Sequence, residues 1–267
     1  PGTGAVDFRQ VSLAVAGEIG RRGGDILMQR TVTGIAARSD GMVVQTSGGD
    51  LHARWIITCA GLHSDRVAAM TGNAGDLRIV PFRGNYAAVK PAARGLIRSQ
   101  INPVPDPRFP FLGVHFTRRV DGAVWVGPNA VLAFAREGYT RTDISPRDLA
   151  ETLLFPGFLR LITRDLRIGL GEMWRDVFKA SFVRNFQRYV PELRSDDVEF
   201  GPSGVRAQAV DRSGRLEDDF SFGESARVIH VRNAPSPAAT SALAIGRTLA
   251  EKAAIAFSLP GPAGDGA

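Results

Sequence analysis

The fold of this chain is decided near its end by His230-Val231-Arg232-Asn233-Ala234-Pro235-Ser236-Pro237-Ala238-Ala239-Thr240-Ser241-Ala242-Leu243-Ala244-Ile245-Gly246. The residues from Arg227 to Val231 are rich in β-branched side chains and predict a short buried strand. Residues 238–257 have the apolar spacing of a single helix. Two prolines lie between these elements, so the stretch predicts a strand, a rigid turn and a helix.

The start of this helix is made of small residues. Ala238, Ala239, Thr240 and Ser241 leave the first-turn N–H groups approachable, and these donors have no partner within the helix. The helix dipole adds partial positive charge there, which suits a phosphate, a carboxylate or an electron-rich carbonyl. An ordinary corner capped by a serine or threonine explains the same pattern, so both interpretations stay open.

Composition excludes several classes of protein. The chain has 267 residues, 44% hydrophobic content and a net charge of +6, which is typical of a globular protein. Its arginines are scattered and no nucleic-acid motif is present, so we expect no nucleic acid as a partner. The positive charge favours anionic small molecules and is compatible with peripheral contact to an anionic membrane. We expect neither a transmembrane helix nor a signal peptide.

Cysteine and histidine usage argues against a metal or disulfide framework. Cys59 is the only cysteine, and the four histidines are spread along the chain without metal-ligand spacing. We expect no bound metal and a cytoplasmic location, where thiols stay reduced.

The rest of the chain alternates between short strands and helices. Residues 55–59 form an apolar run that predicts a strand buried on both faces, followed by Ala60-Gly61 and a helix from Leu62. Such a corner lets a nucleotide approach the backbone. No Gly-x-Gly-x-x-Gly fingerprint occurs, and Gly2-Thr3-Gly4 has no preceding strand.

Further strands are expected at 25–29, 31–36, 42–46, 51–58, 198–200, 204–210 and 220–222. An antiparallel sheet is expected between 77 and 127, and helices at 7–22, 146–154, 157–168 and 174–189.

Several blocks of sequence carry a family resemblance. They are Pro81-Phe82-Arg83-Gly84, residues 103–115, residues 126–134, Arg136-Glu137-Gly138-Tyr139, Gly204-Val205-Arg206-Ala207-Gln208 and the stretch quoted first. Together they closely resemble the L-2-hydroxyglutarate oxidase/dehydrogenase family, which belongs to the FAD-dependent oxidoreductases of the D-amino-acid oxidase and glycine oxidase type. The resemblance covers about residues 4–252.

The resemblance implies a mixed α/β (α+β) fold with two domains. Residues 1–80 and 199–258 would form a discontinuous FAD-binding domain, and residues 81–198 a substrate-binding domain with a mainly antiparallel sheet and helices. Residues 259–267 would be a flexible tail. The family's glycine-rich βαβ unit precedes the residue that is Pro1 here, so we expect this chain alone to bind FAD weakly or not at all. Asn85 also departs from the family pattern, in which an acid follows Arg-Gly.

The implied reaction oxidises L-2-hydroxyglutarate to 2-oxoglutarate, with hydride leaving C2 for the flavin. Arg206 would bind the substrate carboxylate through its planar guanidinium. His115 would take the hydroxyl proton, because an imidazole titrates near neutral pH. A hydrogen-bonded core histidine is the alternative reading of His115. His230 is a rival candidate for the base because it is close to the expected flavin-contacting turn, although its strand position favours a structural role. A second polar contact to the dicarboxylate is expected from Arg83, Tyr86, Arg118 or Asn129.

The resemblance also places cofactor contacts. They are Val32 near the adenine, Cys59, Ala60, Gly61 and Leu62 near the ADP moiety, and Gly204, Val205, Pro235, Ser236, Pro237, Ala238, Ala239 and Thr240 near the isoalloxazine.

Two other functions fit the same residues. A related FAD enzyme would act on an amino acid or glycerol phosphate, whereas a non-catalytic remnant would bind a carboxylate or a partner without flavin. The electron acceptor, oxygen or a membrane quinone, and the oligomeric state do not follow from the sequence.

Overall fold

The computed structural model describes residues 4–104, 115–164, 166–235 and 238–259. The chain divides into two compact units. Unit 1 comprises Pro1–Glu18 and Val80–Arg206, and unit 2 comprises Ile19–Ile79 and Ala207–Ala267. The boundaries between the units thus fall at 18/19, 79/80 and 206/207, whereas the sequence placed divisions only at 80/81 and 198/199 and assigned residues 1–18 to the FAD-binding domain. The predicted tail falls almost entirely outside the described residues.

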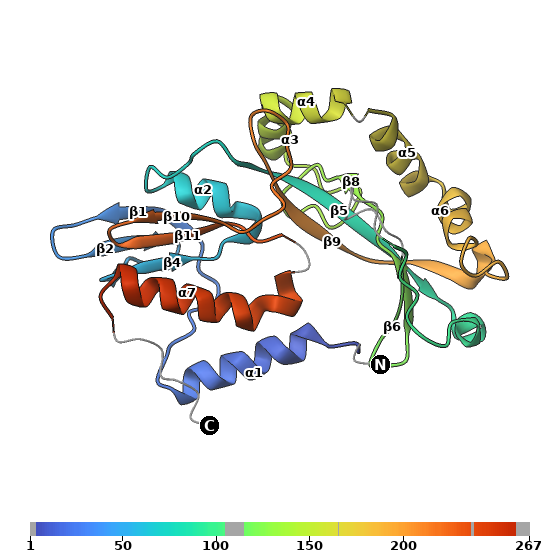
Figure 1. The fold of residues 1–267 in the computed structure, drawn as a ribbon, viewed down its shortest axis with the longest axis horizontal. Coiled ribbons are helices and arrows are strands. Elements are labelled where there is room, and N and C mark those ends of the chain that lie inside the picture. Colours follow the sequence, from blue (N-terminus) through green and yellow to red (C-terminus); the bar gives the residue numbers. More distant parts are fainter. Residues whose placement is uncertain (1–3, 105–114, 165, 236–237, 260–267) are drawn as a thin grey trace. The chain divides into compact units, whose positions relative to one another are not determined.

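Unit 1 is built on a sheet around one long strand, β5 (Arg78–Val89). On one edge, β5 pairs antiparallel with β7 (Val124–Gly127) and β8 (Val131–Leu132), and β6 (His115–Arg118) pairs with β7. The strand β9 (Val198–Val210) also pairs with β5. The long β5 and β9 strands are visible in Figure 1. The β6–β7 hairpin turns at Asp121-Gly122, where the Asp121 carboxylate accepts the Ala123 N–H at 2.9 Å.

Helices cover one face of this sheet. They are α3 (Pro146–Leu153), α4 (Pro156–Arg164), α5 (Leu166–Val177) and α6 (Lys179–Phe186), with the 3-10 turns η2 (Pro91–Leu96) and η3 (Ser195–Asp197) beside them. Phe182 and Phe186 of α6 pack against strand residues that include Ala87, Phe116 and Val126. Burial of these large side chains removes apolar area from water and fixes α6 on the sheet.

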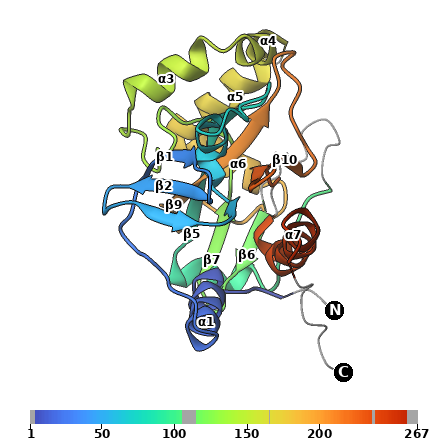
Figure 2. The same cartoon turned by 90° about the vertical axis from the view of Figure 1, so that its left-hand side faces the viewer.

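Unit 2 contains two small sheets. The first is an antiparallel meander of β1 (Val32–Ala37), β2 (Met42–Thr46) and β3 (Leu51–Ala53). The second has the order β10 (Ser221–Ser225), β11 (Val228–Asn233), β4 (Ile56–Thr58), with β11 and β4 parallel. Figure 2 shows β1 and β2 side by side and α7 nearly end-on.

The buried strand β11 separates two packed layers of unit 2. Ile229 and Val231 contact Leu249, Ala253 and Phe257 at helix α7 (Ala242–Ala256), which the 3-10 turn η4 (Ala238–Ser241) precedes. Val228 points the other way, into a cluster with Val67 of α2 (Ser64–Ala69) and residues of the meander. The turn η1 (Gly61–His63) leads into α2. Helix α1 (Phe8–Arg21) belongs mostly to unit 1, whose first segment ends at Glu18.

The structure confirms the mixed α/β class, the antiparallel sheet and most of the expected elements, with five differences. Residues 25–29 form no strand, and residues 51–58 are two strands, β3 and β4, of different sheets. The helix expected at 174–189 is interrupted at Phe178, and the strands expected at 198–200 and 204–210 are the single strand β9. The strand at 55–59 is not buried on both faces, since Ile57 is 43% exposed.

Candidate functional site

The expected cofactor residues of unit 2 meet at one edge of its parallel strand pair. His230 on β11 is paired with Thr58 on β4, and both strands run in the same direction. The chain therefore leaves both strands at the same edge, where Cys59 follows β4 and Ala234 follows β11. Ligands of open α/β sheets bind at the carboxyl ends of parallel strands. Val32, at the start of β1, belongs to the separate meander sheet.

Small residues keep this edge accessible. Gly61 has φ +51, and a Cβ at this position would meet no heavy atom within 4 Å. Cys59 and Gly61 are exposed, whereas Ala60 and Leu62 are half-buried. Because the backbone is not covered by bulky side chains here, another molecule can approach it closely.

The chain that leaves β11 at this edge leads to the start of helix α7. Ala239 and Thr240 are exposed in η4, and Ala238 and Pro235 are half-buried. Ser241 is the N-cap of α7, but its side chain makes no capping hydrogen bond. The N-terminal N–H groups of α7 thus lack the serine cap that would compete with an electron-rich ligand atom. Ser236 and Pro237 lie outside the described residues. Together, the two segments offer accessible backbone and a helix start without a side-chain cap, which suit an electron-rich ligand atom.

His230 is fully buried behind this edge. Its Nδ1 lies 2.8 Å from Thr58 Oγ1, and its Nε2 lies 2.7 Å from Thr71 Oγ1. Burial lowers the pKa of His230, and the charge of Arg232 lowers it further. With both ring nitrogens engaged, His230 links β11, β4 and the end of α2 rather than acting as a base.

The unit 1 sheet carries the expected reactive side chains on the face away from its helices. Ala87, Phe116 and Val126 enter the helical core. Because side chains alternate along a strand, Tyr86 and His115 occupy the opposite face.

Gly127 leaves room between these two side chains. It is paired with His115, and a Cβ on it would lie 3.2 Å from Tyr86 Cδ1. Trp125 of β7 contacts Tyr86 on the same face, with ring centroids 5.7 Å apart.

Tyr86 and Arg206 form an electrostatic pair. Burial raises the pKa of Tyr86, and the positive charge of Arg206 partly offsets that rise. Burial lowers the pKa of Arg206, and Tyr86 opposes this change. The guanidinium nevertheless stays protonated, since arginine does not lose its proton in proteins. Unit 1 therefore holds a partly desolvated cation near a phenol, which is a suitable environment for a carboxylate. Gly204, on β9, is exposed, and Val205 is half-buried.

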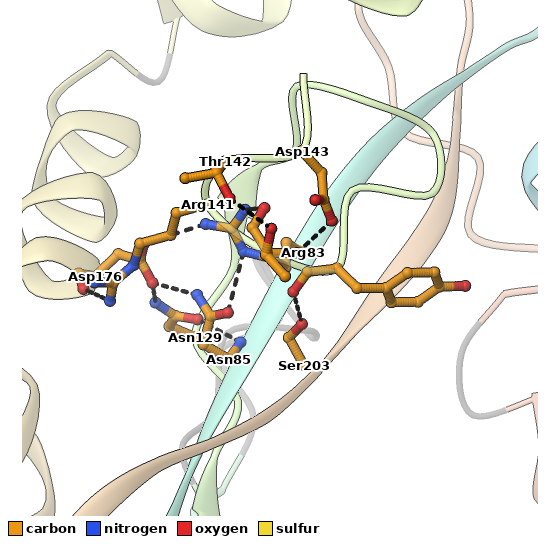
Figure 3. Close-up of polar contacts among 10 residues, drawn as sticks. Arg83, Asn85, Asn129, Arg141, Thr142, Asp143, Asp176 and Ser203 are labelled. Carbon is orange, nitrogen blue, oxygen red and sulfur yellow. Dashed lines mark hydrogen bonds and ion pairs between the residues drawn. The ribbon is translucent and has the colours of Figure 1, made fainter. Parts of the chain in front are cut away.

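Arg83 and Asn129 both contact Asp176 of helix α5. Arg83 is 4% exposed, and its guanidinium donates to Asn85 Oδ1 at 3.1 Å, Thr140 O at 2.7 Å and Asp176 Oδ2 at 3.3 Å. Asn129 donates to Asp176 Oδ1 at 2.9 Å and accepts the Asn85 N–H at 2.8 Å. Both side chains already have protein partners, as Figure 3 shows. Arg118, on β6, donates to Ile97 O at 3.1 Å.

Sequence reasoning missed Asp176 and Arg141. Asp176 follows Trp174 and Arg175 in a helix, where an acid usually belongs to a solvated face. Arg141 lies in an irregular segment after β8 and reaches Asp176 Oδ2 at 3.1 Å. Only the pairing of β5 with β8, which brings distant segments together, could have revealed this cluster.

The described residues also bear on metal binding and membrane insertion. They contain no group of three or more His, Cys, Asp and Glu side chains arranged to hold a metal ion. In the same residues, no helix combines the length and the apolar character that crossing a membrane requires.

Comparison with known proteins places these features in context. Residues 1–252 match the family model described as FAD dependent oxidoreductase. The chain is 50% identical to the mitochondrial L-2-hydroxyglutarate dehydrogenase of Nematostella vectensis, over 97% of this chain and 61% of that protein. Its identity to the L-2-hydroxyglutarate dehydrogenase of Escherichia coli is 45%, over 94% and 60%. The chain thus spans about 60% of the length of these relatives.

Solved structures agree on the fold. L-alpha-glycerophosphate oxidase from Mycoplasma pneumoniae, with FAD bound, matches with a TM-score of 0.61 at 19% identity, over 88% of this chain and 53% of that one. Glycine oxidase from Bacillus cereus matches with a TM-score of 0.53 at 15% identity, over 96% and 57%. At these identities the likeness concerns the fold alone, and it confirms the expected oxidase-like architecture.

Proposed function

The chain belongs to the family of FAD dependent oxidoreductases, and on this premise we propose that its protein oxidises L-2-hydroxyglutarate to 2-oxoglutarate. The observation that carries the proposal is the 44–50% identity to relatives named L-2-hydroxyglutarate dehydrogenase. Unit 1 supports it, since Tyr86 and His115 share a sheet face and the charge of Arg206 acts on Tyr86. These residues offer a phenol, an imidazole and a cation to a hydroxy acid.

Arg206 is proposed to bind the substrate carboxylate next to the reacting carbon. A guanidinium forms two parallel hydrogen bonds to a carboxylate, which fix its orientation as well as its position. Partial burial strengthens this interaction because water competes less for the charge. The Tyr86 hydroxyl is a second donor in the same environment. Because Arg83 and Asn129 are engaged with Asp176, they support the sheet from its other face in this scheme.

His115 is proposed to take the proton of the substrate hydroxyl at an imidazole nitrogen. The side chain is half-buried on β6 and shares its sheet face with Tyr86. A neutral imidazole is a suitable base for this step. When bound, FAD supplies the acceptor for the hydride that leaves C2. The chain's own residues orient the hydroxy acid and remove its proton.

Unit 2 is proposed to contact the cofactor through its two corners. The small residues Cys59, Ala60 and Gly61, with Leu62, would approach the ADP moiety, and Val32 the adenine. Pro235, Ala238, Ala239 and Thr240 are this unit's proposed contacts to the isoalloxazine. Gly204 and Val205 on β9 are separate candidates for a flavin contact from unit 1. Ser236 and Pro237 complete the expected set. The start of α7 would stabilise negative charge on the flavin ring.

We propose a cytoplasmic protein that passes its electrons to a quinone through peripheral membrane contact. The net charge of +6 supports contact with an anionic lipid surface. Oxygen is the competing acceptor. Hydrogen peroxide production in air would identify oxygen as the acceptor, whereas quinone reduction without peroxide would support the membrane route.

A substrate panel tests the proposed reaction. The product of the complete gene that encodes this chain is supplied with FAD and an artificial electron acceptor. Turnover of L-2-hydroxyglutarate, at least tenfold faster than that of glycine or glycerol 3-phosphate, is the expected result. Turnover of either competitor alone would reassign the substrate. A folded product that binds no FAD would instead support a non-catalytic carboxylate-binding protein.

A further inference from the structure

The carboxylate of Asp176 is the centre of the polar cluster on the helical side of the unit 1 sheet (Figure 3). Asp176 is 6% exposed. Its Oδ1 accepts hydrogen bonds from Asn85 Nδ2 and, at 2.9 Å, from Asn129 Nδ2. Its Oδ2 accepts from Arg83 Nη2 at 3.3 Å and Arg141 Nε at 3.1 Å. The four donors match the roughly four lone-pair positions of a carboxylate.

The charge of this cluster depends on Asp176. Arg83 is slightly more buried than Asp176, and their ion pair is shielded from solvent. Loss of the carboxylate would leave the Arg83 cation buried without its counter-ion, which is costlier than loss of an exposed pair. Arg141 is half-exposed and adds a bond from its Nη2 to the Asp176 carbonyl oxygen. Asp176 therefore joins α5 to β5 and to the segment after β8.

Two of the four donors, Asn85 and Asn129, belong to the backbone segments that carry Tyr86 and the strand partner of His115. Asn85 directly precedes Tyr86 on β5, and the two side chains point to opposite faces because they alternate. Asn129 lies two residues after Gly127, which is paired with His115. Asn129 also accepts the Asn85 N–H through its side chain, at 2.8 Å. The Asp176 carboxylate thus holds both backbone segments that present Tyr86 and His115.

We propose that Asp176 is a positioning residue, which acts through Asn85 and Asn129 to hold Tyr86 and His115 in place across the sheet. The expected effect of Asp176 on catalysis rests on the proposed function. Its expected effect on the pKa of Tyr86 is independent of that function. Asp176 reaches neither side chain directly, so its influence passes through the backbone of β5 and of residues 127–129.

The first test measures Tyr86 without any need for activity. Tyr139→Phe and Tyr189→Phe leave Tyr86 as the only tyrosine, whose ionisation is followed by ultraviolet absorbance while circular dichroism monitors folding. Asp176→Asn should lower the pKa of Tyr86 toward that of free tyrosine, because β5 loosens and burial decreases. Asp196→Asn, at an exposed position of η3, is the matched control and should leave the titration unchanged.

The second test exchanges the two partners. Asp176→Asn combined with Asn85→Asp moves the carboxylate to the strand and the amide to the helix, with no change in total charge. A hydrogen bond between positions 85 and 176 remains possible, and Arg83 Nε already donates to residue 85. Relative to Asp176→Asn, the double variant should recover at least half of the lost unfolding free energy. It should also recover at least half of the decrease in the Tyr86 pKa. Failure of the exchange to restore either would contradict the proposed route through Asn85.

Kinetics complete the test in the FAD-loaded product of the complete gene. Asp176→Asn should raise KM for L-2-hydroxyglutarate about tenfold and lower kcat less. A folded variant with unchanged Tyr86 titration and unchanged KM would overturn the proposal, even if its stability fell. If Asp176→Asn does not fold, Arg141→Gln, which removes two contacts from the exposed side, is judged by the same measurements. If the wild type fails to oxidise L-2-hydroxyglutarate, the proposed function fails, and the Tyr86 titration still decides the role of Asp176.

Discussion

Asn85 and Asn129 are joined by two reciprocal hydrogen bonds. The Asn85 N–H donates to Asn129 Oδ1 at 2.8 Å, and the Asn129 N–H donates to the Asn85 carbonyl oxygen at 3.4 Å. These bonds hold the connection between β7 and β8 against β5. Tyr86 follows one partner, and Gly127, the strand neighbour of His115, precedes the other, so the pair lies directly behind the proposed reactive face.

Gly127→Ala should destabilise unit 1. Gly127 has φ +135, and a Cβ there would lie 2.7 Å from the Asn85 carbonyl oxygen. Strain and displacement together should cost about 1–3 kcal/mol, measured by urea unfolding. Gly95→Ala is the matched control, because a Cβ at Gly95 meets nothing within 4 Å. Equal stability of the two variants would argue against close packing at residue 127.

Arg206→Lys should weaken substrate binding while the protein stays folded. Lysine keeps the charge but loses the planar fork that pairs with a carboxylate. KM for L-2-hydroxyglutarate should rise roughly 10-fold to 100-fold. Arg215→Lys, at a 78% exposed arginine paired with Asp211, is the control and should leave KM unchanged. A KM unaffected by Arg206→Lys would remove Arg206 from the proposed site.

Ala239→Leu should reduce FAD retention. Ala239 is exposed in η4, next to the start of α7, where a larger side chain would cover the backbone. The dissociation constant for FAD should increase at least severalfold, as measured by fluorescence titration of the product of the complete gene. Ala256→Leu, at the other end of the helix, should bind FAD like the wild type. Tighter or equal binding by Ala239→Leu would place the flavin elsewhere.

Stability should fall as pH decreases below about 6.5, where a free histidine gains its proton. Burial lowers the pKa of His230, and the Arg232 charge adds to the effect. The folded state therefore binds this proton less readily than the unfolded state, so acid favours unfolding. The stability that neutral His230 contributes is present above the unfolded pKa and is lost as pH falls through the folded pKa.

Urea unfolding of His230→Gln at several pH values checks this assignment. The variant should be less stable than the wild type at pH 8, since two buried threonine contacts change, and it should lose less stability on acidification. His52→Gln, at an exposed position, should retain the wild-type pH dependence. Parallel pH curves for wild type and His230→Gln would show that another group is responsible.

Local signals in the sequence predicted much of the fold. The Asp121-Gly122 turn identified the β6–β7 hairpin, and the run from Arg227 identified β11, because a few adjacent residues determine each element. Residues 51–58 were misread as one strand, since β3 and β4 pair with distant partners, β2 and β11. Sequence periodicity carries no information about which sheet a short strand joins.

The site was predictable to the extent that it repeats family motifs. Arg206 and His115 stand in blocks that resemble the family, Tyr86 lies two residues after one of them, and the roles of all three remain predictions. Asp176 gave no signal, because its side-chain partners are 35–93 residues away in the chain. The sequence indicates Arg83 only as one of four side chains that could make a second contact to the dicarboxylate; in the structure its guanidinium is engaged within unit 1.

Anaerobic titration shows whether L-2-hydroxyglutarate reduces the bound flavin. The FAD-loaded product of the complete gene is mixed with L-2-hydroxyglutarate in the absence of oxygen, and the visible flavin absorbance is followed. The account predicts loss of the oxidised flavin spectrum with one 2-oxoglutarate formed per flavin. A protein that retains its oxidised flavin spectrum with excess L-2-hydroxyglutarate, but loses it with glycine or glycerol 3-phosphate, would contradict the account.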